Sequence, residues 1–191
     1  GGMSQPALGR QKSIEWAKSL VAEGTAVIID TETTGLGIEA EICDVGVVSI
    51  NGTILLDTLV KPRNPIPPGA TAVHGITDEM VADAPPFSVV YDMLTDVLGD
   101  SVIVYNLDYD FKIINQCARA EGLPEFDLTG GWGCAMLAFS EYDGTIGKYG
   151  SLKWHKLDFA AETFGIPPGG HRALADAETT RRVILAMAEA S

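Results

Sequence analysis

Two short apolar runs constrain the fold of this chain more than any other feature. Residues 25–30 (TAVIID) and 101–105 (SVIVY) are rich in β-branched side chains and too short for amphipathic helices, so they predict strands buried on both faces. Between them, residues 41–50 and 53–61 flank Asn51-Gly52, a dipeptide typical of a two-residue hairpin turn. The chain is therefore expected to form a sheet with buried central strands and an antiparallel hairpin.

Helical patterns surround these strands. Helices are predicted over residues 13–23, 87–98, 109–120, 134–141, 155–164 and 173–190. Ser13 is a suitable N-cap for the first helix, and the prolines from Pro62 to Pro68 are expected to continue the second hairpin arm as a loop. This order of elements indicates an α/β fold, a mixed sheet with helices packed on its faces.

The length of 191 residues suits one domain with an adequate core. Gly1 and Gly2 before Met3 are typical of an expression scar. We expect residues 1–12 to be a disordered N-terminus and residues 13–191 to form a single domain.

The composition excludes several classes of protein. No window reaches the ~18 apolar residues of a membrane span, and no signal peptide is recognisable. The three cysteines, Cys43, Cys117 and Cys134, are scattered, which favours a reducing cytoplasm over a disulfide framework or a zinc site. The net charge of −13 argues against a broad electrostatic grip on nucleic acid.

Asp30 and Glu32 come where the first buried strand ends. Residues two apart on a strand point to the same face, so the two carboxylates can project together and would raise each other's pKa. A divalent cation such as magnesium would resolve this repulsion. The alternative is a solvated loop that happens to carry two acids.

Three further residues could join this pair. Asp110 begins a helix directly after the second buried strand, although Asp108 competes for the same role and Asn106 could be an ordinary turn residue. His171 and Asp176 lie where the last helix begins, next to Gly169 and Gly170. A carboxylate at a helix N-terminus also has a purely electrostatic explanation, and a loop histidine is commonly a surface residue, so the residues alone leave these roles open.

Taken together, these segments resemble the DEDDh branch of the DEDD exonuclease superfamily. The resemblance rests on Asp30–Gly35, Asn106–Asp110 and His171–Asp176 as its three motifs, with residues 72–77 (AVHGIT) as a further matching segment. It covers residues 26–188 and is strongest for the proofreading (epsilon) subunits of bacterial DNA polymerase III. Asp44 departs from the family pattern, which often has Glu there, and Tyr105 stands where a smaller or more polar residue is usual.

The resemblance implies a ribonuclease H-like fold, a mixed five-stranded sheet with its first three strands antiparallel. It assigns Asp30, Glu32, Asp110 and Asp176 to two divalent metal ions, Mg²⁺ or Mn²⁺, and His171 to the general base. It also implies substrate contacts, made by Thr31, Thr33, Thr34, Gly35, His74, Ile76, Asn106 and Tyr109. For Ile76 the alternative is that it and Val73 are simply core residues. The implied reaction is 3′→5′ hydrolysis of single-stranded nucleic acid, DNA in the first instance, with release of nucleoside 5′-monophosphates.

The segment between Asp143 and Asp158 contains no acid. It interleaves basic and aromatic residues, namely Lys148, Tyr149, Lys153, Trp154, His155 and Lys156. Such a patch can follow a single strand while rings stack on its bases, and we assign Lys153 and Trp154 to substrate binding; we expect no chemical role for His155. The alternative is a solvated helix start with Trp154 and Leu157 packed inward.

Two other functions remain open at this stage. An exoribonuclease or short-oligonucleotide hydrolase would use the same chemistry, and only a contact to the 2′-OH would separate it. A non-catalytic, polymerase-associated nucleic-acid-binding module is disfavoured, because a scaffold has no need of four repelling carboxylates. No long tail follows the last predicted helix, so we expect a stand-alone enzyme or one whose polymerase partner docks on the globular surface.

Overall fold

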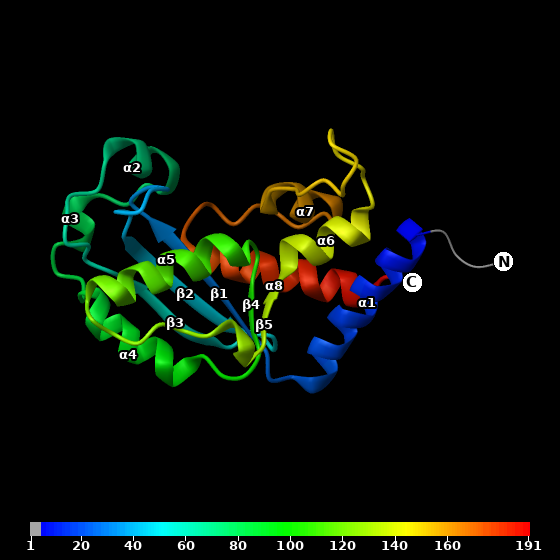
Figure 1. Cartoon of the computed structure of the whole chain (residues 1–191), viewed down its shortest axis with the longest axis horizontal. Coiled ribbons are helices and arrows are strands. Elements are labelled where there is room, and N and C mark those ends of the chain that lie inside the picture. Colours follow the sequence, from blue (N-terminus) through cyan, green and yellow to red (C-terminus); the bar gives the residue numbers. More distant parts are fainter. Residues whose placement is uncertain (1–4) are drawn as a thin grey trace.

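The computed structural model describes residues 5–191, and its centre is a mixed five-stranded sheet in the order β3-β2-β1-β4-β5 (Figure 1). Strands β1 (Val27–Thr33), β2 (Ile42–Ser49) and β3 (Ile54–Leu59) are antiparallel neighbours. Strands β4 (Val102–Val104) and β5 (Trp132–Cys134) continue the sheet parallel to β1. The predicted α/β class and strand arrangement are confirmed.

Both faces of the sheet are covered by helices. Helices α1 (Gln5–Glu23), α6 (Ala135–Asp143), α7 (Leu157–Thr163) and α8 (Ala173–Glu189) share one hydrophobic core with Ile28 of β1. Helices α4 (Phe87–Val97) and α5 (Leu107–Ala120) share the other core with Val27 and Ile29. Because side chains alternate along a strand, this pattern puts Asp30 and Glu32 on the α8 side of β1 and Thr31 on the α5 side.

The hairpin between β2 and β3 forms around Asn51-Gly52, as predicted, but its loop is longer than a two-residue turn. The Gly52 N–H donates to the Ser49 carbonyl at 2.9 Å, and the Ser49 N–H donates to the Thr53 carbonyl at 2.8 Å. Gly52 has a φ of +94°, a conformation that side-chain-bearing residues rarely adopt. The hairpin tip also contacts α8, since a Cβ on Gly52 would lie 3.3 Å from the Arg181 guanidinium.

Two short helices, α2 (Pro68–His74) and α3 (Asp78–Val81), lie at the end of the sheet where β1 ends (Figure 1). They cover a small third core formed by Cys43, Ile66, Ile76 and Val81. The prediction of a plain loop after β3 is therefore wrong from Pro68 onward: a proline suits the first helical position, where its missing N–H costs nothing.

The first helix begins earlier than the sequence suggested. It starts at Gln5 rather than at Ser13, whose hydroxyl donates to the carbonyl of Arg10 inside the helix. The expectation of disorder over residues 1–12 is thus wrong for residues 5–12, and its remaining part lies outside the described residues. Within residues 5–191, no helix is long and apolar enough to cross a membrane.

Candidate active site

Three carboxylates, two of them on one strand and the third distant in sequence, meet at the end of β1. Asp30 and Glu32 project from the strand, and Asp176 comes from the first turns of α8. One oxygen from each of the three lies within 4.8 Å of the others. The two-residue spacing on β1 and the packing of α8 against this strand produce this convergence.

Asp110 lies beside this group at the start of α5. Its side chain is buried, and its Oδ1 accepts hydrogen bonds from the Thr31 backbone N–H (3.2 Å) and the Thr31 hydroxyl (2.7 Å). Its negative charge raises the pKa of Asp30, whereas Asp108 is exposed. Of the two acids between which the sequence could not choose, Asp110 is the one that joins the cluster.

The four carboxyl groups are mutually destabilising when charged. Burial, followed by the charges of Asp110 and Asp176, raises the pKa of Asp30 well above its ordinary value. Burial and Asp176 raise the pKa of Glu32 to about 9. Burial raises the pKa of Asp110 to about 7, although the bonds from Thr31 act in the opposite direction. The cluster therefore favours protons or a compensating positive charge.

This donor set fits hard divalent cations. Asp30 Oδ2 is inaccessible to water and has no hydrogen-bond partner within the described residues, which is a costly arrangement unless a ligand completes it. Clustered carboxylate oxygens are the ligands that Mg²⁺ and Mn²⁺ prefer. Asp30, Glu32 and Asp176 are the residues best placed to hold a cation, and Asp110 adds a fourth charge beside them.

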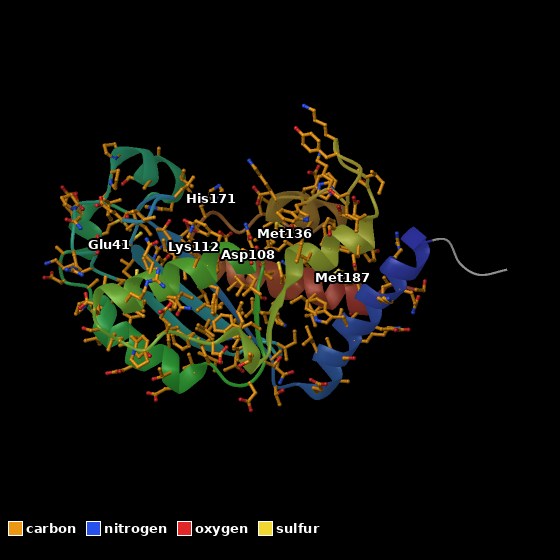
Figure 2. The ribbon with its side chains drawn as sticks, viewed as in Figure 1. Glu41, Asp108, Lys112, Met136, His171 and Met187 are labelled. Atoms are coloured by element: carbon orange, nitrogen blue, oxygen red, sulfur yellow. The ribbon has the colours of Figure 1, made fainter. Side chains whose placement is uncertain are left out.

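His171 is exposed on the loop between α7 and α8 (Figure 2). Its φ of +65° is the one left-handed value at a non-glycine residue in the described chain, and Gly170 before it has a φ of +90°. Burial raises the pKa of Asp176 above its ordinary value. The ring and the backbone of His171 act on this pKa in the opposite direction, so the histidine lies close to the Asp176 carboxyl. The structure thus brings the predicted base to the rim of the acidic cluster.

The other residues of the first motif fix the loop that follows β1. The Thr33 hydroxyl and the Tyr109 hydroxyl both donate to the carbonyl of Gly35, at 2.9 and 3.0 Å. Thr34 Oγ1 accepts from the backbone N–H of Glu41 at 2.9 Å. A Cβ on Gly35 would meet no atom within 4 Å, so there is open space around this position of the loop.

His74 and Ile76 do not face that space. His74 is buried, with Nε2 3.0 Å from the carbonyl of Thr33 and Nδ1 accepting from the backbone N–H of Ile76. Ile76 is fully buried, while Val73 is 60% exposed. The expected substrate contact by Ile76 is therefore wrong for this structure, because the residue belongs to the core beneath α2 and α3.

The basic and aromatic segment before α7 is a surface feature. Tyr149 and Trp154 are 88% and 62% exposed, and the lysines among them are exposed as well. Buried His155 anchors the segment, since its Nε2 lies 2.9 Å from Asp143 and its ring stacks on Phe159. The alternative prediction is that Trp154 and Leu157 both pack inward. It is confirmed for Leu157, which packs against the core, and is wrong for the exposed Trp154. Asn106 is exposed at the start of α5.

Two charged residues beside the site were not recognised as partners from the sequence. Asp44 of β2 is buried opposite Glu32, and its Oδ2 lies 2.9 Å from Nε of Arg172. The available signal was an acid inside the apolar strand ICDVGVV, which is unusual for a buried position. For Arg172, the sequence offers no indication of a role except its position next to His171.

The fold and the acidic cluster define the class of this protein. The chain belongs to the exonuclease family, whose model (Exonuclease) matches residues 27–184. The structure is similar to the nuclease domain of 3′hExo, a DEDDh family member bound to rAMP, with a TM-score of 0.67 at 19% identity over 83% of this chain and 88% of that one. The protein is therefore a hydrolytic exonuclease with a ribonuclease H-like fold.

Two sequence relatives and one further solved structure are similar to this chain over most of their length. The chain is 42% identical to the uncharacterized exonuclease CP81 of Escherichia phage 186, over 87% of this chain and 90% of the phage protein. It is 31% identical to DNA polymerase III subunit epsilon of Aquifex aeolicus, over 93% of this chain and 87% of that subunit. Exonuclease X in complex with 5′ overhanging duplex DNA has a TM-score of 0.59 at 31% identity, over 84% of this chain and 89% of that one.

Proposed function

We propose that this protein removes nucleotides from the 3′ end of single-stranded nucleic acid, DNA in the first instance, and releases nucleoside 5′-monophosphates. One observation carries the proposal: acidic side chains from three distant segments meet at the end of β1, with His171 at their rim. The match to the exonuclease family and the similarity to polymerase III epsilon subunits support the same polarity and substrate.

In this proposal each residue has a defined task. Asp30, Glu32, Asp110 and Asp176 hold two Mg²⁺ or Mn²⁺ ions, which supply a lowered water pKa and neutralise charge on the phosphate. His171 accepts the proton of the attacking water through a ring nitrogen. The water oxygen bonds to phosphorus and the bond to the 3′-oxygen breaks, so the shortened strand keeps a 3′-hydroxyl.

The surface around the cluster supports single-stranded ends as substrate. The open space around Gly35, in the loop directly after β1, supports room for a terminal nucleotide near this end of the strand. Tyr149 and Trp154 offer exposed rings for base stacking, and Lys153 and Lys156 offer charge to the phosphates. Thr31, Thr33, Thr34, His74 and Tyr109 support this site indirectly, through the bonds that fix β1, α5 and the loop after β1.

The cellular setting is part of the proposal. Free cysteines at positions 43, 117 and 134 suit a reducing cytoplasm. Similarity to polymerase III epsilon subunits supports docking to a DNA polymerase as a further role. Co-purification with a polymerase would test that role separately from hydrolysis.

The deciding experiment uses 5′-labelled DNA and RNA oligonucleotides with Mg²⁺, with Mn²⁺ and with chelator. We expect a ladder that shortens from the 3′ end and depends on the metal, and the relative rates identify the preferred sugar. Asp176→Asn serves as the inactive control. Release of the label as a mononucleotide in the first turnover would show the opposite polarity and contradict the proposal.

A further inference from the structure

The starting point is the contact between Asp44 and the residues that begin α8. Asp44 is 1% exposed, and its Oδ2 accepts from Nε of Arg172 at 2.9 Å and from the backbone N–H of Ala173 at 3.0 Å. Arg172, the N-cap residue, provides no side-chain cap of its own. A carboxylate from β2 thus caps α8 and holds the arginine next to His171 through one oxygen.

Gly46 allows this close approach. It is two residues after Asp44, so both face α8 from the same side of β2. A Cβ on Gly46 would lie 2.4 Å from Cα and N of Leu174, a separation that atoms cannot tolerate. The first turn of α8 is therefore seated against β2 at a fixed height.

The segment 169–172 is held in place at both ends. At its beginning, a Cβ on Gly169 would lie 2.8 Å from the Ala175 carbonyl oxygen and the Thr179 hydroxyl, so the glycine packs directly on α8. At its end, Arg172 is bound to Asp44. Between these anchors, His171 is exposed and adopts a left-handed φ of +65°, a conformation that persists only where the surroundings enforce it.

The negative charge of Asp44 also has a cost. Its Oδ1 is buried without a hydrogen-bond partner in the described residues, and its charge adds to those that raise the pKa values of Asp30 and Glu32. A neutral acceptor would cap α8 without these penalties. The gain that the charge brings is its pairing with the arginine beside His171.

We infer that Asp44 and Arg172 form a positioning pair that holds His171 in the orientation its catalytic role needs. The inference rests on the proposed function, because that function gives His171 its catalytic role. The contact between Asp44 and Arg172 is observed independently of that function. Arg172 acts through the backbone of its neighbour rather than by touching the substrate.

Substituting Asp44 would remove the helix cap as well as the pair, so the test is made at Arg172. Arg172→Met keeps the side chain as far as the position of Nε but removes the donor and the charge. Arg172→Gln restores a donor, because its amide nitrogen occupies the position of Nε. Exposed Arg182 on the same helix provides the matched control, Arg182→Met.

We expect Arg172→Met to lower kcat ~10- to 100-fold, as small misplacements of catalytic groups do. The KM for a 5′-labelled oligonucleotide and the affinity for Mn²⁺ should stay unchanged. Arg172→Gln should recover most of the loss, and Arg182→Met should behave as the wild type. A raised KM with unchanged kcat, or failure of glutamine to restore the rate, would show that Arg172 contacts the substrate and would overturn the inference.

A second measurement does not depend on hydrolysis. The chain has three histidines, and buried His74 and His155 provide internal references for NMR. In the wild type, the backbone amide of His171 should be ordered despite its exposure, with an order parameter of ~0.85. This order parameter should fall below ~0.6 in Arg172→Met but not in Arg182→Met. An unchanged order parameter would contradict the positioning pair, whereas an inactive wild type with this NMR result would contradict only the proposed function.

Discussion

The acidic cluster and the loop carrying His171 lie side by side but are built in opposite ways. The carboxylates are on a central strand and two helix starts, and Asp110 is buried and held by two hydrogen bonds from Thr31. His171 is exposed, left-handed and preceded by Gly169 and Gly170. The first region is built on regular secondary structure and is electrostatically strained, and the second is an exposed loop segment held at both ends.

This difference separates two requirements of the proposed reaction. Cations of high charge density need several oxygens fixed in advance, even though the bare site is destabilised by repulsion. A proton acceptor must reach a water that is present only with the substrate, so an exposed position beside the entrance suits it. The comparison teaches that the negative charge is concentrated on a strand and two helix starts, whereas the proposed proton acceptor is on an exposed loop. The following changes test each of these two regions.

The largest effect is expected at Asp30. Asp30→Asn should lower hydrolysis about 10⁴-fold or more, because loss of a shared cation ligand removes several kcal/mol of charge stabilisation. Asp108→Asn makes the same change at an exposed acid of α5 and should leave the rate unchanged. The rates are measured under single-turnover conditions with saturating Mg²⁺. Normal turnover by Asp30→Asn would show that this carboxylate has no part in the mechanism. The acidic cluster would then not be the metal-binding region that the comparison assumes.

His171→Ala should have the next largest effect. The hydrolysis rate should fall roughly 10²- to 10⁴-fold, the usual contribution of a general base. Because the carboxylates do not depend on the histidine for their positions, Mn²⁺ affinity measured by calorimetry should stay within a factor of about three. Loss of metal binding together with activity would show that the loop and the cluster form one unit.

Local sequence predicted where Asp30 and Glu32 lie in the fold. The first residues of β1 are apolar and β-branched, which favours a strand, and the two-residue spacing then puts both carboxylates on the same side of it. The hairpin was predictable in the same way, because Gly52 readily adopts the left-handed φ of +94° found in its loop. Local chemistry was sufficient in these places.

Other features depend on contacts that no local pattern records. Strand β5 is three residues long, and it exists because it pairs with β4. An isoleucine such as Ile76 can either contact a substrate or belong to a core, and the sequence does not distinguish the two. The packing of α2 and α3 places Ile76 in the small third core. The partnership of Asp44 with Arg172 joins residues separated by 128 positions, so its recognition required the tertiary structure.

The exposed basic and aromatic segment should contribute a smaller effect, on binding alone. Lys153→Ala combined with Lys156→Ala should weaken oligonucleotide affinity about tenfold and reduce the slope of log Kd against log salt by about 1 to 2, since each lysine that contacts a phosphate releases a counterion. The control is Lys12→Ala with Lys18→Ala, an equal change of charge on exposed positions of α1. The single-turnover rate at saturating substrate should not change. An unaltered salt slope would assign the segment to a solvated surface.

The smallest effect concerns the stability of the metal-free protein. The pKa values of Asp110 and Glu32 are raised to about 7 and about 9, so the folded state binds more protons than the unfolded state, whose carboxyls titrate near ~4. The free energy of unfolding should therefore decrease as the pH rises through these values, because the native carboxyls lose their protons against burial and repulsion.

Asp30→Asn removes one charge from the centre of this group. Urea unfolding in chelator should show the wild type losing stability between about pH 6 and pH 9, and the variant should be more stable by about 1–2 kcal/mol at the upper end. Mn²⁺ should restore the wild type far more than the variant, since it offsets the same repulsion by binding. A wild type whose stability is level across this range would show that the carboxylates are not strained, and the contrast between the cluster and the histidine loop would then rest on geometry alone.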